Sequence, residues 1–254
     1  MGRVFLIIAF LSFSVPAYPF LPDDEIALLQ KELAMKPIGE RIAFWAEKFV
    51  GTLYDSDPHG EYVTKKAIVA DERVDCMYLT FRVVELSLAK TPTEAVTIAL
   101  DKRFIGKGRI SEGRVANYED RFQRGEDMMA SGKWGRDVTE KIGLATETEV
   151  LKDGRKIKIL SKGTLRSVFV ASNSHALQVQ SFRSGDLIFF VKSPAQRISD
   201  EVVGHIGIVK EERDILYLIH AKGMKNRGGV VEKVLLSKYI ISMPFVGIRI
   251  SRFE

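Results

Sequence analysis

The sequence contains a single cysteine, Cys76, in a setting that suits a nucleophile. Asp75 precedes it and is a good N-cap residue, so we expect a helix to begin here with Cys76 in its first turn. The unpaired N–H groups and the dipole of a helix start favour a thiolate and supply donors for an oxyanion. The helix itself is indicated by apolar residues at helical spacing, namely Leu79, Val83, Leu86 and Ala89.

A lone cysteine has two ordinary interpretations. It is either an inert thiol in the core, where cysteine is among the most buried residue types, or a residue kept for its reactivity. The second interpretation needs a further group, because the carboxylate of Asp75 disfavours a neighbouring thiolate by like charge. A cationic neighbour must therefore come from elsewhere in the chain, which contains four histidines.

Two of these histidines, His205 and His220, occupy strand-like segments separated by a polar turn. His205 opens the run 204–209, and His220 closes the run 215–220. A hairpin centred on Glu212-Arg213 places His205 opposite His220, and directly opposed residues share a sheet face with Cβ atoms ~4.5–5.5 Å apart. The sequence therefore predicts a pair of imidazoles on one face of a β-ribbon.

This pair suits catalysis, because a cysteine nucleophile needs a base and the base needs an orienting group. His205 can accept the thiol proton, and His220 can fix the tautomer of His205 by hydrogen bonding. Gly204 and Gly207 leave room beside the base for a substrate. Two other interpretations stay open at this point. The histidines are structural, or they bind zinc, which would need a third ligand that no nearby carboxylate on the same face supplies.

Helical patterns dominate the first half of the chain. Asp23-Asp24 is expected to cap a helix that carries Ile26, Leu29 and Leu33 on one face. A second helical pattern begins at Ile38 and ends at Gly51. Thr91-Pro92-Thr93-Glu94 is a capping box that starts another helix, and a further helix is expected over 117–130.

The second half of the chain changes to β-rich runs with short turns, which predicts an antiparallel sheet. A surface hairpin is expected over 151–162. Helices followed by strands indicate an α+β protein, with a helical part at about 23–145 and a sheet part at about 155–254 of one domain. The expected strands cover 187–191, 206–209, 215–219, 230–235 and 246–250.

The first residues have the pattern of a secretory signal peptide. Arg3 is followed by an apolar run over 4–13 and by Val15-Pro16-Ala17, which offers a small residue for cleavage. The run is shorter than the ~20 apolar residues that a membrane-spanning helix needs. We therefore expect 1–17 to be a signal peptide and 18–254 to be a single exported domain, periplasmic and soluble.

Composition restricts the class of protein without selecting a partner. Hydrophobic residues make up 46% and charged residues 28% of the 254-residue chain, as in ordinary globular proteins. The net charge of +5 suits an anionic polymer or surface. One cysteine excludes an internal disulfide framework and a cysteine-based zinc cluster.

The other two histidines are less informative. His175 lies in a polar stretch and is expected at the surface, and a substrate contact by His59 is open.

The order of these motifs resembles the NlpC-type papain-like cell-wall hydrolases, in particular their N-acetylmuramoyl-L-alanine amidase-like branch. Asp75-Cys76 is similar to the family's nucleophile motif, and Gly204-His205-Ile206-Gly207-Ile208 to its base strand. His220-Ala221 matches the third catalytic position. Further matching segments are Gly51-Thr52-Leu53-Tyr54, Ser184 to Phe190, Asn117 to Arg121, Trp134-Gly135, Asp137-Val138-Thr139 and Gly247 to Ile250.

The resemblance implies a papain-like α+β fold and a catalytic triad of Cys76, His205 and His220. It implies that Tyr54 lines the site, and Asp75 and Gly204 are the other expected substrate-binding residues. The implied reaction cleaves the amide between N-acetylmuramic acid, in its 1,6-anhydro form, and L-alanine in peptidoglycan fragments. No cofactor and no metal are expected, the partners are muropeptides rather than nucleic acid, and the mature chain is expected to be a monomer without stable membrane insertion.

Because of two departures from the family pattern, the sequence indicates the type of reaction more strongly than the identity of the substrate. Leu53 replaces the usual proline, and Thr80-Phe81 lies further beyond Cys76 than the corresponding pair does. The alternatives are an endopeptidase of the same fold that cuts between D-glutamate and the diamino acid, a catalytically inactive muropeptide-binding protein and, more remotely, an acyltransferase. Four arginines are either carboxylate contacts or solvated charges: Arg114, Arg121, Arg124 and Arg136.

Overall fold

The computed structural model describes residues 20–151, 154–171, 181–198 and 201–254. The expected signal peptide at 1–17 and His175 therefore lie outside the described residues. The α-helices of the described part are α1 (Asp23–Leu33), α2 (Ile38–Lys48), α3 (Glu61–Thr64), α4 (Cys76–Leu88), α5 (Pro92–Lys102), α6 (Gly125–Ala130), α7 (Lys162–Ala171) and α8 (Leu236–Ser242). None of these helices is both long and apolar enough to cross a membrane.

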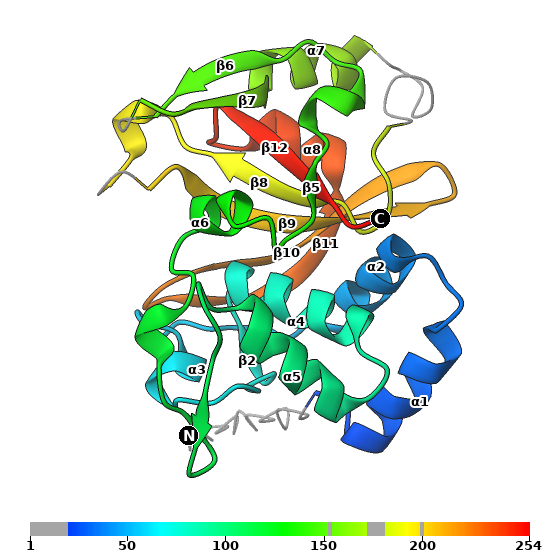
Figure 1. Ribbon diagram of the computed structural model, residues 1–254. Coiled ribbons are helices and arrows are strands. Elements are labelled where there is room, and N and C mark those ends of the chain that lie inside the picture. Colours follow the sequence, from blue (N-terminus) through cyan, green and yellow to red (C-terminus); the bar gives the residue numbers. More distant parts are fainter. Residues whose placement is uncertain (1–19, 152–153, 172–180, 199–200) are drawn as a thin grey trace, which may run out of the picture.

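A single large sheet runs through the molecule (Figure 1). Its order in the described residues is β2-β1-β11-β10-β9-β8-β12-β7-β6, with β5 also pairing with β12. The strands are β1 (Leu53–Tyr54), β2 (Arg73–Val74), β5 (Arg136–Asp137), β6 (Glu147–Val150), β7 (Lys156–Ser161), β8 (Leu187–Val191), β9 (Val203–Glu212), β10 (Ile215–Met224), β11 (Gly228–Leu235) and β12 (Gly247–Arg252), and a separate small ladder joins β3 (Ile110–Ser111) to β4 (Arg114–Val115).

The α+β class is confirmed, and each of the five strands expected in the second half coincides with or overlaps one of β8 to β12. Their pairing is antiparallel, as predicted. The sheet is nevertheless mixed, because β1 and β2 pair in parallel. The hairpin expected over 151–162 is formed by β6 and β7 and begins earlier, at Glu147. Short strands from the helical half thus extend the sheet beside β11.

Two helix predictions are wrong in detail. Helix α1 begins at Asp23 with Pro22 as its N-cap, so the two aspartates lie in the first turn rather than at the cap. The segment 117–130 is not one helix, because its middle pairs with the chain after α5: Phe104 and Arg121 form a β-bridge. Only a 3₁₀ turn and the short α6 remain helical there.

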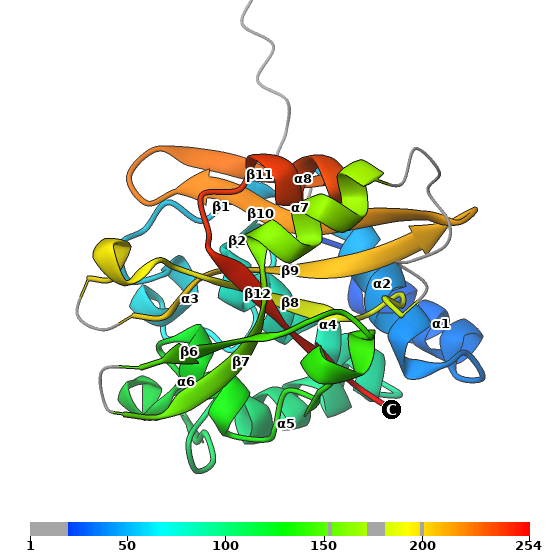
Figure 2. The ribbon, with the colours of Figure 1, turned by 90° about the horizontal axis from the view of Figure 1, so that it is seen from above.

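Helices cover both faces of the sheet, as Figures 1 and 2 show. One face carries α2 and α4, and a core that includes Trp45, Phe81, Ile206 and Ile219 lies between them and the strands. The other face carries α7 and α8, with a second core that includes Phe190 and Leu236. Side chains that alternate along β9 and β10 therefore enter two different environments.

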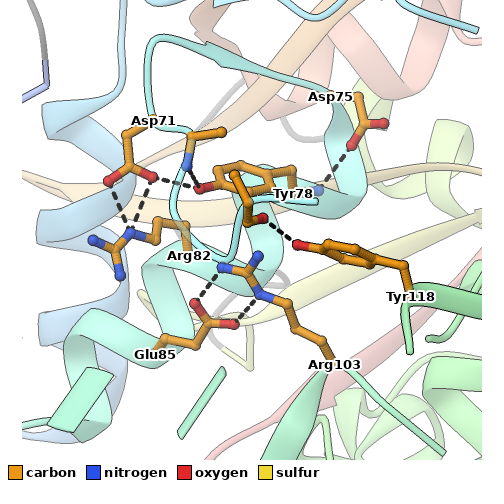
Figure 3. A network of polar contacts seen from close by, with 9 residues as sticks. Asp71, Asp75, Tyr78, Arg82, Glu85, Arg103 and Tyr118 are labelled. Atoms are coloured by element: carbon orange, nitrogen blue, oxygen red, sulfur yellow. Dashed lines mark hydrogen bonds and ion pairs between the residues drawn. The ribbon is translucent and has the colours of Figure 1, made fainter. Parts of the chain in front are cut away.

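Helix α4, which begins at Cys76, is buried on all sides from Tyr78 to Ser87. Two of its charged residues have buried partners of opposite charge (Figure 3): Arg82 pairs with Asp71, and Glu85 forms a two-pronged ion pair with Arg103 at 2.6 and 2.7 Å. The Tyr78 hydroxyl donates to Asp71 at 2.8 Å and accepts from a backbone N–H at 2.6 Å. These contacts anchor α4 to the segments around it.

Candidate active site

Cys76 is the first residue of α4, as the sequence predicted. Asp75 is the N-cap and accepts a hydrogen bond from the backbone N–H of Tyr78 at 2.8 Å. The strand β2 ends one residue before Asp75, so strand and cap together fix where the helix begins. The thiol is thus placed among the backbone donors of a helix N-terminus, partly covered by protein.

The β9–β10 hairpin has a different register from the one predicted. Its turn is Arg213-Asp214, with φ of 50° and 64°, rather than Glu212-Arg213. Two successive left-handed residues are the geometry of a tight hairpin turn. Val209 consequently pairs with Leu218 instead of Leu216. The shift of two positions keeps side chains on the same face, so His205 and His220 become diagonal neighbours rather than direct opposites.

The two imidazoles are hydrogen bonded, with 2.9 Å between Nε2 of His205 and Nδ1 of His220. Both rings lie against Tyr239 of α8, and Phe190 and Phe245 also flank His205. Burial, assisted by the neighbouring His220, lowers the pKa of His205 to about 3. Burial also lowers the pKa of His220, although Glu232 acts in the opposite direction. Both imidazoles are therefore neutral at pH ~7 and available as a base and its orienter.

Helix α4, which begins at Cys76, packs against β9 and β10. Their register ends at Ile219 opposite Ile208. The backbone N–H of Ile206, which directly follows His205, lies near the Cys76 thiol and acts to lower its pKa. Within the described residues no hydrogen bond joins the sulfur to either imidazole. Catalytic hydrogen bonds often tighten only when substrate binds, so this spacing is compatible with a resting nucleophile and base.

The free thiol is not pre-ionised, contrary to what its position at a helix start indicated. Burial, followed by the charge of Asp75, raises the pKa of Cys76 to about 12. The N–H of Ile206 and the ammonium of Lys225 act in the opposite direction without prevailing. Loss of water around the sulfur outweighs the helix dipole here. The Cys76 thiol and the His205 imidazole are therefore both uncharged in the resting protein.

Lys225 is the cationic neighbour of Asp75 that the sequence could not identify. It lies in the connection between β10 and β11, and its Nζ is 3.1 Å from the carboxylate of Asp75 and 3.2 Å from the carbonyl oxygen of Asp55. The ammonium also lies 5.7 Å from the ring centroid of Tyr54. Lys225 thus balances the charge next to the nucleophile.

Replacing Lys225 by methionine should slow alkylation of Cys76 by iodoacetamide ~3- to 10-fold at a fixed mildly alkaline pH, because the unbalanced Asp75 carboxylate disfavours the thiolate. The Lys225→Arg variant keeps the charge and serves as the matched control. Equal alkylation rates for the methionine and arginine variants, with both proteins folded, would show that the ion pair does not influence the thiol.

Tyr54, on β1, is buried close to the nucleophile. Burial, followed by the charges of Cys76 and Asp75, raises its pKa. A Cβ atom at Gly223 would lie 2.1 Å from the Tyr54 ring, so only glycine permits this ring to pack against β10. Tyr54 therefore lines the region of Cys76 from the side opposite α8.

A pocket of about 530 Å³ opens on the other side, beneath α8. Gly204, His205 and His220 form part of its wall. Glu232 also lines it and lies 3.2 Å from Nε2 of His220, so the expectation that no carboxylate lies near the imidazoles on this face is wrong. The sequence could not place Glu232 because its strand pairing had not been predicted. The remaining lining residues are Lys222, Gly223, Val234, Lys238, Tyr239, Ser242, Pro244 and Phe245.

Cys76, Asp75 and Tyr54 are not among the residues that line this pocket, and neither are the remaining candidates. His59 is exposed in the loop before α3, where its backbone N–H donates to Asp57 at 2.8 Å. The four arginines considered as carboxylate contacts are exposed or half-buried and are absent from the pocket wall: Arg114, Arg121, Arg124 and Arg136.

No protein-family model and no curated protein sequence matches the chain. Several solved structures, in contrast, are similar to the chain. An N-acetylmuramoyl-L-alanine amidase from Bacteroides uniformis has a TM-score of 0.62 at 19% identity, covering 85% of this chain and 99% of that one. A Legionella pneumophila protein of the family DUF1460 has a TM-score of 0.65 at 16% identity, covering 90% and 93%.

A proposed xylanase from Bacteroides fragilis has a TM-score of 0.59 at 17% identity, covering 83% of this chain and all (100%) of that one. At these identities the likeness establishes a shared fold and leaves the chemistry to be argued from the site. The chain therefore has the fold of structures named as amidases.

Proposed function

We propose that the protein is an exported cysteine amidase that cleaves the amide between N-acetylmuramic acid, in its 1,6-anhydro form, and L-alanine in peptidoglycan fragments. The observation that carries the proposal is the hydrogen-bonded pair of His205 and His220, which borders a pocket, together with a thiol at the start of α4, the helix that packs against the strands of both histidines. The amidase name of structures with this fold supports the choice of bond. The proposal also includes the assignment of the fold to the papain-like, NlpC type and a monomeric state of the protein.

In the first half-reaction His205 accepts the Cys76 proton as the sulfur attacks the lactyl carbonyl carbon. The new carbon–sulfur bond leaves an oxyanion, which the backbone N–H groups of the first turn of α4 stabilise. His205 then gives its proton to the amide nitrogen, the carbon–nitrogen bond breaks, and the L-alanine amine leaves. A thioester between Cys76 and the muramoyl lactyl group remains.

In the second half-reaction His205 takes a proton from water as the water oxygen attacks the thioester carbonyl. The carbon–sulfur bond breaks, and the imidazolium returns its proton to the Cys76 sulfur. The acid of the muramoyl group is released and the neutral thiol and imidazole are restored. General acid–base help of this kind contributes ~10²–10⁴-fold.

The site chemistry also bears on the alternatives. Glycoside hydrolysis, which the name of the Bacteroides fragilis structure indicates for that protein, uses two carboxyl groups on either side of the bond. Among the described residues that line the pocket, Glu232 alone carries a carboxyl group. An endopeptidase would use the same thiol and imidazoles on another amide, so only the products separate it from the proposed amidase.

Digestion of defined muropeptides, with and without the anhydro sugar, tests the proposal by mass spectrometry. Release of complete stem peptides that begin with L-alanine is the expected result. Stems truncated after D-glutamate would instead establish the endopeptidase, and binding without any cleavage would establish a muropeptide-binding protein. Fractionation of cells that express the full chain checks export separately.

The pH dependence of kcat/KM should reflect the buried histidines. A base with a lowered pKa stays unprotonated as the pH falls through ~6.5, where an ordinary histidine becomes charged. Since burial lowers the pKa of His205 to about 3, we expect the acid limb well below pH ~6.5. Rates measured from neutral to acidic pH on a soluble muropeptide check this, and an acid limb centred near pH ~6.5 would contradict it.

A further inference from the structure

Glu232 extends the chain of hydrogen bonds that begins with the imidazoles of His205 and His220. It lies directly opposite His220 in the pairing of β10 with β11. Its Oε1 is 3.2 Å from Nε2 of His220, while Nδ1 of the same ring contacts His205. The His220 side chain is 3% exposed and that of Glu232 is 25% exposed, so the contact is shielded on the histidine side.

The chemistry of these groups determines which atom donates and which accepts in each of the two hydrogen bonds. An ionised carboxylate only accepts hydrogen bonds, so Nε2 of His220 must carry the proton in the contact with Glu232. The neutral ring then has a free lone pair at Nδ1, which accepts from Nε2–H of His205. His205 is left with its own free lone pair at Nδ1. That atom is the one able to take a proton from a thiol.

We propose that Glu232 is a positioning residue of this site: by holding His220 in the Nε2–H tautomer it sets His205 as an Nδ1 base. This inference rests on the proposed function for the identity of the nucleophile. The proton that moves goes from the Cys76 sulfur to Nδ1 of His205, and the protons of the two hydrogen bonds stay on their nitrogens. The carboxylate balances the positive charge that His205 then carries.

Several charged or titratable groups face the imidazole pair. They are Lys222 from β10, Lys238 and Tyr239 from α8 and Glu232 itself from β11, and the charge of Cys76 on α4 acts on Tyr239. Glu232 raises the pKa of His220, whereas Lys222 lowers it. Removing one or the other charge should therefore move the acid limb of kcat/KM in opposite directions.

The competing explanation is that Glu232 serves only as the partner of Lys222, whose Nζ lies 3.2 Å from Oε2. Four variants separate the two roles. Glu232→Leu removes the acceptor, and Glu232→Gln keeps an acceptor oxygen without the charge. Lys222→Met removes the ion pair and leaves the contact with His220. Lys233→Met removes a charge from the neighbouring position of β11, which pairs with Glu47 and Glu212, and is the matched control.

We expect Glu232→Leu to lower kcat on a defined muropeptide ~10- to 100-fold with little change in KM, as for other groups that orient a reacting residue. Glu232→Gln should retain more of the rate and shift the acid limb to lower pH. Lys222→Met should shift it to higher pH, and Lys233→Met should leave it in place. Equal effects of Glu232→Leu and Lys222→Met on both kcat and pH profile would overturn the proposal.

A second measurement does not depend on turnover. Long-range ¹H–¹⁵N correlation spectra of the ¹⁵N-histidine-labelled protein distinguish the two tautomers of a neutral ring, with His205→Gln and His220→Gln variants used for assignment. The wild-type protein should show the Nε2–H form at both positions, and His220 should lose it in Glu232→Leu. The Nδ1–H form in the wild type, or an unchanged spectrum in Glu232→Leu, overturns the proposal. Because the spectra require no substrate, failure of the amidase assay alone would affect the proposed function and not this tautomer assignment.

Discussion

Cys76→Ala is expected to lower the rate of amide cleavage by at least ~10³-fold, because without the sulfur no acyl-enzyme can form. The neutral His205 would remain, but a base with no nucleophile to activate leaves only the help of substrate binding and backbone donors. The stability of the protein should change little, because the substitution removes one sulfur atom at the first residue of α4 and leaves the Asp75 cap in place. The effect on catalysis should therefore be separate from any effect on folding.

Initial rates on a soluble muropeptide, followed by mass spectrometry, measure this effect. Cys76→Ser keeps the size and hydrogen bonding of the side chain and should lose nearly as much rate, since a hydroxyl is a poorer nucleophile. Thermal unfolding followed by circular dichroism confirms that both variants are folded. Amide cleavage at the wild-type rate by Cys76→Ala would remove the mechanism proposed for this site.

Arg103→Met should lower the free energy of unfolding by about 3–5 kcal/mol, the largest stability effect that we expect from one side chain. Glu85, its partner, has a fully buried side chain at 0% exposure, and Arg103 is 1% exposed. The guanidinium also lies 4.8 Å from the ring centroid of Tyr78. Removing Arg103 would leave the Glu85 carboxylate, on the helix that begins at Cys76, buried without a counter-charge (Figure 3).

The double variant Glu85→Leu with Arg103→Met is the matched control for this pair. It removes both charges, and buried ion pairs replaced by apolar residues are often neutral in stability. Urea unfolding should therefore place the double variant closer to the wild type than to Arg103→Met. A double variant less stable than the single one would show that Arg103 acts through packing rather than by pairing with Glu85.

The elements that carry the candidate site could be predicted from the sequence because their signals are local. Asp75 caps a helix whichever partner the helix later meets, and the β-branched runs around His205 and His220 need only two strands and a polar turn. The same-face relation of the histidines survived an error of two positions in register, because side chains alternate with a period of two. An error of one position would have separated them.

The remaining parts of the site depend on contacts between distant segments. Lys225 reaches Asp75 only because the β10–β11 connection packs against the segment after β1, where the backbone N–H of Asn226 donates to the carbonyl of Ser56. Glu232 meets His220 only through the register of β11. The pKa of Cys76 is set mainly by burial, which a local motif does not reveal. Such contacts follow from tertiary packing rather than from periodicity.

In the proposed mechanism the nucleophile and the base come from opposite halves of the chain, Cys76 from α4 and His205 from β9, and these two elements pack against each other. A nascent polypeptide that has not yet completed this packing would carry the thiol without the proposed proton acceptor. Under this proposal the chain becomes able to hydrolyse its substrate only when the tertiary structure has formed, and it is inactive before folding is complete.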